Sequence, residues 1–429
     1  MSILRQLQLP RWSRNLLRQP AHVTVSLTGS HLPALDAIRG LAILLVTLYR
    51  FRLGPDDGMW FEHVYTHVLS LGERGVDLFF VLSGFLITGI LFDSKSDRHY
   101  FRNFYMRRSL RIFPLYYGVL LGCFVILPIV WPASIQYPFA DAREVQNWLW
   151  LYGVNMRVGW HNDWCFGSFN HFWSLAVEEH FYLIWPLAIF VLSRRSAMNV
   201  CVVFGIFALV ARIAWLVLGG NGLAPEVFTP FQFDALLIGA WLALAARGPG
   251  GLAALVPACR LAFQLCLGLL LPEMVLHQRW LTVPSTFYAI MFGSLIILAL
   301  SAKRGGLAEQ CWNSRCLRWL GKYSYGMYVF QNLLIPVLAM LFTAESLAAL
   351  CGSAFAGRLL YLAVMFAATM VTAYVSWHLY EKHFLKLKCF FSPTSSAGGL
   401  AAREEGQAHP NLPESCMRST TPIRSTPQP

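Results

Sequence analysis

Charged side chains are scarce in this 429-residue chain, at 13% of the total. Soluble globular domains carry roughly 25% charged residues, whereas hydrophobic side chains here reach 56%. The mean hydropathy is +0.50. This composition excludes an ordinary soluble domain and predicts an all-α protein that crosses the lipid bilayer many times.

Two further signals are missing. The ten cysteines form no C-x-x-C pair and no metal-ligand spacing, so we expect neither a metal nor a cofactor. Residues 1–31 carry arginines at positions 5, 11, 14 and 18 but no apolar run typical of a signal peptide, which predicts a basic cytoplasmic N-terminal segment.

Residues 389–429 are polar and rich in Ser, Pro and Gly, and we expect a disordered cytoplasmic tail.

Ten apolar stretches run through residues 32–388, the predicted transmembrane domain. They lie at 35–53, 76–92, 112–131, 173–192, 200–218, 233–246, 261–276, 286–302, 324–342 and 359–378. If all ten span, most of the 34 basic residues fall on the side that holds both termini. This asymmetry predicts cytoplasmic termini and a multi-pass protein of an inner or plasma membrane. It also explains the net charge of +12, so we expect no nucleic-acid partner.

Arg50 is an unexpected charge in the first stretch, "LDAIRGLAILLVTLYRF". A helix rises about 1.5 Å per residue, which places Arg50 about 16 Å above Arg39 in a hydrocarbon core about 30 Å thick. A buried arginine costs about 2.5–3.5 kcal/mol on the insertion scale. Three explanations stay open: a structural ion pair, a side chain that extends outward beside Arg52, and a functional pocket.

The fourth stretch supplies a candidate partner for Arg50. His171, Ser174 and Glu178 are spaced by three and four residues, so they share one face of a helix. Glu178 is expected about 10 Å below His171, near the depth of Arg50. We therefore predict an ion pair between Arg50 and Glu178. Ser83, which precedes Gly84, indicates close helix packing rather than a nucleophile.

Other polar residues, Ser174 among them, are expected to converge in the outer half of the membrane as candidate substrate-binding residues. Asp77 and Asp234 lie at the outer ends of the second and sixth stretches, and Gln331 lies about 13 Å up the ninth. The outer loop 132–172 is rich in Trp, Tyr and Asn. Its aromatic side chains form either an interfacial belt or a surface on which sugars stack.

Basic residues gather at the cytoplasmic helix ends. Asp36 and Arg39 begin the first stretch, and Arg107, Arg108 and Arg111 precede the third. The three arginines of the second group either bind phosphates or anchor the helices on the cytoplasmic side. The sequence alone leaves both roles open.

Six segments resemble the acyltransferase-3 family of membrane proteins, and they occur in the family's order over residues 32–388. These segments are "LDAIRGLAILLV", "GVDLFFVLSGFLIT", "RRSLRIFPLYY", "FWSLAVEEHFYLIWP", "FDALLIGAWLA" and "KYSYGMY". The resemblance implies ten spans and transfer of an acyl group from acyl-CoA to a carbohydrate hydroxyl. It also implies that Arg39 and the arginines at 107, 108 and 111 help to bind acyl-CoA as a co-substrate.

The chain departs from the family pattern at several positions. Arg39 matches the family's arginine in the first span, but Arg50 stands where the family has the histidine taken as the catalytic base. Gln331 replaces a second histidine, Gln232 replaces an arginine two residues before Asp234, and "EKH" at 381–383 replaces "EKP".

These replacements leave three outcomes open. An imidazole accepts a proton near neutral pH, whereas a guanidinium binds anions or stabilises an oxyanion. Glu178 or His171 then acts as the base, or the protein uses a different donor or acceptor. Alternatively, catalysis is lost and the protein binds or passes a lipid-linked sugar. Our prediction is a membrane O-acyltransferase acting on a carbohydrate of the cell envelope.

Overall fold

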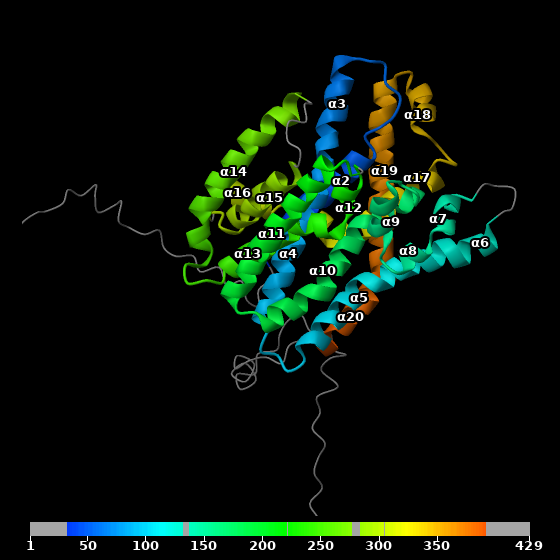
Figure 1. The fold of residues 1–429 in the computed structure, drawn as a ribbon. Coiled ribbons are helices and arrows are strands. Elements are labelled where there is room, and N and C mark those ends of the chain that lie inside the picture. Colours follow the sequence, from blue (N-terminus) through cyan, green and yellow to red (C-terminus); the bar gives the residue numbers. More distant parts are fainter. Residues whose placement is uncertain (1–31, 132–136, 221, 277–283, 304, 392–429) are drawn as a thin grey trace, which may run out of the picture.

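The structure is a computed structural model that describes residues 32–131, 137–220, 222–276, 284–303 and 305–391 (Figure 1). Every regular element in these ranges is helical. The long helices are α2 (Pro33–Arg50), α4 (Gly75–Asp93), α5 (Tyr100–Leu121), α10 (Phe172–Val191), α11 (Arg194–Val217), α13 (Thr229–Ala245), α14 (Gly251–Leu276), α15 (Pro284–Leu300), α17 (Arg315–Leu338) and α19 (Ala354–Ser376).

The remaining helices are short. They are α3 (Trp60–Ser70), η1 (Leu71–Arg74), η2 (Gly122–Ile126), α6 (Leu127–Val130), α7 (Ala140–Glu144), α8 (Asn147–Trp150), α9 (Val154–His161), η3 (Gly167–Phe169), α12 (Ala224–Val227), α16 (Leu307–Trp312), α18 (Ala344–Cys351), η4 (Trp377–Glu381), α20 (Lys382–Lys386) and η5 (Leu387–Phe391).

Each of the ten predicted apolar stretches overlaps one long helix, so the all-α prediction is confirmed. Seven helical segments of the described chain are long and apolar enough to cross a membrane, and α15 is apolar but shorter. The count of ten and the cytoplasmic termini stay predictions. Residues 1–31 and 392–429 lie outside the described residues, and η5 reaches into the first residues of the predicted tail.

The helices differ in which faces they bury. Helix α4 carries apolar residues on every side and packs against α2, α10, α13 and α15, as expected for a helix enclosed by others. Helices α11 and α14 instead expose apolar side chains such as Val203, Phe207 and Leu265. These exposed apolar faces suit contact with lipid, because the hydrocarbon core offers no hydrogen-bond partner to a polar group.

Two helix crossings are close because glycines meet there. In the α2–α17 crossing, a Cβ on Gly40 would overlap the carbonyl of Leu317, and one on Gly321 would overlap the carbonyl of Asp36. In the α4–α13 crossing, Gly84 and Gly239 have the same role. Small residues allow such backbone approach within a membrane. The predicted packing role of Gly84 is thereby confirmed.

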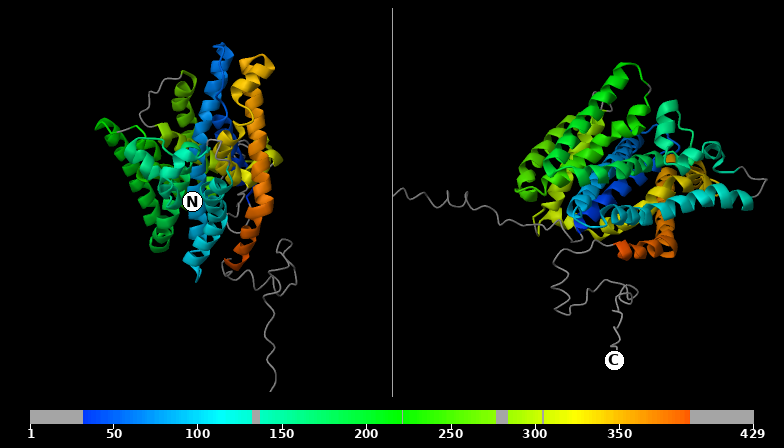
Figure 2. Two further views of the ribbon diagram at one scale, coloured as in Figure 1. Left: turned by 90° about the vertical axis from the view of Figure 1, so that its right-hand side faces the viewer. Right: turned by 60° about the horizontal axis from the view of Figure 1, so that its bottom comes forward.

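Helix α2 lies in the middle of the bundle, between α17 and α4 (Figure 1). Helices α11, α13, α14 and α15 lie on one side of it, and α5, α17 and α19 lie on the other. Helices α3 and α18 extend from the same end of the molecule (Figure 2). Asp77, at the first turn of α4, is therefore enclosed by neighbouring helices, whereas Asp93 at its other end is exposed.

The position of Arg50 differs from the predicted one. Helix α2 ends at Arg50 rather than continuing to residue 53, so Arg50 occupies the last turn and not the interior of a longer helix. A cation in the last turn interacts favourably with the helix dipole. With 18 residues, α2 is about 27 Å long.

Candidate functional site

Three cavities follow one another through the bundle. We name them the Arg107 cavity, of about 550 Å³, the Glu178 cavity, of about 110 Å³, and the Arg50 cavity, of about 670 Å³. Arg39 and Leu86 line both the Arg107 and the Glu178 cavities, and Val76 lines both the Glu178 and the Arg50 cavities. The three spaces are therefore neighbours in series.

The Arg107 cavity lies among the helix ends that the charge distribution assigns to the cytoplasm. Asp36, Arg39 and Arg107 line it, together with Asp93 and Arg247. Arg39 Nη1 lies 3.3 Å from Asp36 Oδ1. Arg247 binds Asp93 through two hydrogen bonds of 2.6 and 2.7 Å, which tie the segment just after α13 to the end of α4. Because Arg107 is exposed and forms no ion pair with another described residue, it is available to an anionic ligand.

The Glu178 cavity joins the predicted arginines to the predicted acid. Arg39 of α2 and Arg108 and Arg111 of α5 line it, as do Glu178 and Glu179 of α10. Arg108 and Arg39 are both electrostatic neighbours of Glu178. Among the lining residues, only these two carboxylates can accept a proton, because guanidinium groups, hydroxyls and apolar side chains do not at neutral pH.

Two hydroxyls position the Glu178 carboxylate. The Tyr182 hydroxyl donates a hydrogen bond to Glu178 Oε2 at 3.1 Å, one turn further along α10. The Ser83 hydroxyl from α4 contacts the Tyr182 hydroxyl and lines the same cavity. The sequence prediction assigned only packing to the Ser83–Gly84 pair, whereas the two residues divide the roles: Gly84 packs and Ser83 faces the cavity.

Lys388 is a basic residue of this cluster that the sequence did not predict. It lies in η5, which packs against α5, and its electrostatic neighbours are Arg39, Arg107, Arg108 and Arg111. Like charges repel one another, so the four arginines at this end of the bundle favour a bound polyanion, and Lys388 lies among them. Lys388 follows the last apolar stretch by ten residues, and only the fold of η4, α20 and η5 returns it to α5.

The Arg50 cavity contains the second half of the predicted site. Arg50 and His171 line it together with Asp77, and so do Trp164 of the outer loop and Trp173 of α10. Arg74 Nη1 lies 3.6 Å from Asp77 Oδ2. His171 is 1% exposed, and its Nε2 lies 3.3 Å from the carbonyl oxygen of Val329.

The predicted Arg50–Glu178 ion pair is wrong. Arg50 lines one cavity and Glu178 lines another, and Val76 of α4 lies at the boundary between them. No carboxylate of the described residues pairs with Arg50. Its guanidinium lies 5.3 Å from the centroid of the Tyr49 ring, and its Nε is buried without a hydrogen-bond partner.

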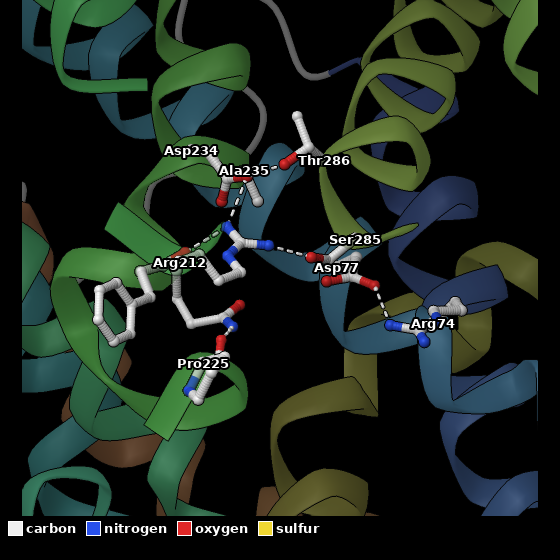
Figure 3. Close-up of polar contacts among 10 residues, drawn as sticks. Arg74, Asp77, Arg212, Pro225, Asp234, Ala235, Ser285 and Thr286 are labelled. Carbon is white, nitrogen blue, oxygen red and sulfur yellow. Dashed lines mark hydrogen bonds and ion pairs between the residues drawn. The ribbon is translucent and has the colours of Figure 1, made fainter. Parts of the chain in front are cut away.

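Asp234 of α13 has an ion-pair partner on another helix, outside the family motif. Arg212 of α11 pairs with it at 2.7 Å, and both side chains are 3% exposed. Arg212 also donates to the carbonyl of Phe231 and to the hydroxyl of Ser285 (Figure 3). The Thr286 hydroxyl donates to Asp234 Oδ2 at 2.5 Å.

This arrangement accounts for the missing arginine at position 232. Gln232 donates to the carbonyl of Pro225 at 2.8 Å, and Arg212 supplies the positive charge beside Asp234 instead. Arg212 and Gln232 both line the Arg50 cavity, so the network of Asp234 forms part of its wall.

Ser174 and Gln331 have different surroundings. Ser174 lines the Glu178 cavity, where its hydroxyl contacts that of Tyr328 and donates to the carbonyl of His171. Gln331 is fully buried and accepts a hydrogen bond from Thr47 at 3.2 Å. This hydrogen bond joins α17 to α2. Gln331 lines none of the three cavities.

The aromatic side chains of the outer loop divide between the two predicted roles. Trp164 lines the Arg50 cavity, where its ring is available for stacking. Trp160 is 77% exposed, which suits an interfacial belt.

Comparison with known proteins places the sequence of this chain in a family. The sequence profile of a family described as "Acyltransferase domain", the third acyltransferase family of its series, matches residues 32–378. The chain belongs to the acyltransferase-3 family. No solved structure is significantly similar to it.

Three relatives carry names that describe O-acetyl transfer. The chain is 26% identical over 330 residues to O-acetyltransferase OatA of Staphylococcus aureus, covering 70% of this chain and 50% of that protein. It is 26% identical over 343 residues to peptidoglycan O-acetyltransferase OatA of Listeria monocytogenes, covering 73% and 52%. It is 27% identical over 333 residues to putative peptidoglycan O-acetyltransferase YrhL of Bacillus subtilis, covering 72% and 49%. The chain thus spans about half the length of these relatives.

Proposed function

We propose that this protein is a membrane O-acyltransferase that moves an acyl group from acyl-CoA to a carbohydrate hydroxyl. The supporting observation is the series of three cavities, with cations at one end, a carboxylate in the middle and a second polar cavity beyond it. The names of the relatives support a cell-envelope glycan, such as peptidoglycan, as the acceptor.

The cationic end suits the phosphates of acyl-CoA. Arg39 and Arg107 line the Arg107 cavity, and Arg108 and Arg111 continue the cluster into the Glu178 cavity. Lys388 lies beside all four. Arginine binds phosphate through paired hydrogen bonds, so this cluster holds the nucleotide part while the thioester extends into the Glu178 cavity.

Glu178 is the proposed proton acceptor. The acceptor hydroxyl enters from the Arg50 cavity and attacks the thioester carbon, so that an oxygen–acyl bond forms and the carbon–sulfur bond breaks. Glu178 takes the hydroxyl proton and returns it to the CoA thiolate. Tyr182 and Ser83 hold the carboxylate in place. His171 is the alternative base, on the acceptor side.

A transfer assay with the purified chain in proteoliposomes tests this function. Radiolabelled acetyl-CoA is supplied on one side, and a peptidoglycan fragment is supplied on the other. Glu178→Gln should reduce transfer by about 100- to 10,000-fold while CoA binding persists. Glu345→Gln, which changes an exposed carboxylate in α18, is the matched control. Normal transfer by Glu178→Gln would reject this base and direct the test to His171→Asn.

The same assay addresses the alternative that Arg50 suggests. A protein that has lost catalysis would bind a saccharide and CoA but would transfer no label, even after Arg50→His restores the family's imidazole. Transfer by the wild-type protein excludes that alternative.

A further inference from the structure

The Arg50 cavity has a charge pattern that acyl transfer alone does not require. Three arginines and three acidic residues line it, namely Arg50, Arg74, Arg212, Glu73, Asp77 and Glu226. Arg74 lies among the three carboxylates, since it pairs with Asp77 and interacts electrostatically with Glu73 and Glu226. Arg212 is paired with Asp234. Two of the three guanidinium groups are therefore balanced by protein carboxylates.

Arg50 is the exception among these three arginines. No carboxylate of the described residues pairs with it, and its buried Nε lacks a hydrogen-bond partner. A buried donor left unsatisfied is unfavourable. The neighbouring charged or titratable groups do not compensate for it, because His171 is not an anion and Tyr49 offers only its ring face. The Arg50 guanidinium nevertheless lines the cavity without a carboxylate of the described residues to balance its charge, so it is available to an anion from outside the protein.

The rest of the lining suits a saccharide. Trp164 and Trp173 offer aromatic faces, and Asn170, Asp77 and Glu73 offer acceptors for hydroxyl groups. A volume of about 670 Å³ lies within the range of pockets that hold small ligands. The hydroxyl groups of a neutral sugar would use the tryptophans and the acceptors and accept hydrogen bonds from Arg50, but they would leave the charge of its guanidinium unbalanced.

We propose that the acceptor unit is an anionic saccharide whose carboxylate or phosphate binds Arg50. Carboxylate and phosphate both match the forked donors of a guanidinium. Arg50 is then a specificity-determining residue and not a proton acceptor, because it stays protonated. This inference rests on the proposed function only in assigning the Arg50 cavity to the acceptor.

Saccharide binding without any acyl donor tests the proposal. The 429-residue chain in lipid nanodiscs is titrated with methyl β-glucuronide, glucose 6-phosphate and methyl β-glucoside, and binding is followed by ligand-observed NMR. At least one anionic probe should bind about ten- to a hundredfold more tightly than the neutral glucoside. The probe that does so identifies the source of the charge.

Variants separate Arg50 from general electrostatics. Arg50→Gln should abolish the preference for the anionic probe while neutral glucoside binding continues, which shows that the variant is folded. Arg50→Lys should keep part of the preference. Arg52→Gln is the matched control, because Arg52 lies two residues away, stacks on Tyr49 at 4.0 Å and does not line the cavity. It should keep the full preference.

Equal affinity for all three probes, no saturable binding of either anionic probe, or a preference that persists in Arg50→Gln would overturn the proposal. Because no acyl-CoA is present, these results do not depend on catalysis. A chain that prefers the anionic probe but transfers no acyl group would keep this site and refute the transferase.

Discussion

At the scale of single residues, Arg50 and Glu178 act in separate cavities rather than as a pair. We therefore predict that their substitutions are nearly independent. Arg50→Ala and Glu178→Gln together should show a coupling free energy below about 1 kcal/mol in a double-mutant cycle. A broken buried pair would instead give about 3–5 kcal/mol.

Thermal unfolding of detergent-solubilised protein, followed by light scattering, measures this coupling. If the double variant recovers most of the stability that Arg50→Ala loses, the two side chains do form a pair in the membrane and the separation of the cavities is wrong.

Arg212–Asp234 is instead a buried ion pair, with both side chains 3% exposed. Arg212→Leu strands a carboxylate that also accepts from Thr286, and it should cost about 3–5 kcal/mol of stability. Arg212→Leu with Asp234→Leu should recover most of this loss, because two apolar groups replace two charges. Arg195→Leu, which removes an exposed arginine of the same helix, is the control. A single-variant loss equal to that of the control would show that the pair is not formed.

Residue positions could be predicted from the sequence only along each helix axis. Residue spacing gave the heights of Arg50 and Glu178, but it did not give the rotation of the helices or the helix between them. Arg212 was missed for the same reason: it stands alone in an apolar helix, and its partner belongs to another. By contrast, Arg39, Arg108 and Arg111 were expected together at one end, and the structure brings them to one cavity.

At the scale of helices, the close crossings depend on glycine. Gly84→Leu in α4 would force a side chain into the carbonyl of Leu236, and overpacking of this kind costs about 1–3 kcal/mol or more. We predict a lower thermal midpoint and loss of monodisperse protein in size-exclusion chromatography. Gly205→Leu in α11 is the control, because nothing lies near its Cβ position. Equal behaviour of the two variants would mean that α4 and α13 are further apart than described.

The positions of the helices could be predicted from the sequence more reliably than the contacts between them. Long apolar runs must hydrogen-bond internally in lipid, so their helical structure follows from composition. The end of α2 did not follow from hydropathy, because Phe51 and Leu53 continue the apolar pattern. The Gly54–Pro55 pair just beyond is the signal that indicated a stop.

At the scale of the whole molecule, the distribution of basic residues predicts the topology. In a cysteine-free background, single cysteines at Ser96, Trp160 and Leu307 all lie at exposed positions. A membrane-impermeant maleimide added outside intact cells should label position 160 and not positions 96 or 307. Labelling at 307 would contradict the ten-span arrangement with cytoplasmic termini.

The series of cavities also leads to a prediction for the whole molecule. If the acyl donor and the acceptor enter from opposite ends, they must meet where two of the cavities join. Val76 is the residue that lines both the Glu178 and the Arg50 cavities. Val76→Trp should fill this junction, so that acyl-CoA and the saccharide each still bind but acyl transfer falls at least about tenfold. Val76→Ala, which widens the junction, should keep transfer.

Binding and transfer must be measured on the same preparation, because a misfolded Val76→Trp protein would lose all three activities together. The informative result is retained binding of CoA and of saccharide with lost transfer, which requires that the two ligands react through the space beside Val76. Normal transfer by a folded Val76→Trp protein would show that they meet elsewhere. The Arg50 cavity would then be a binding site apart from the reaction, and Glu178 would act on an acceptor that enters by another route.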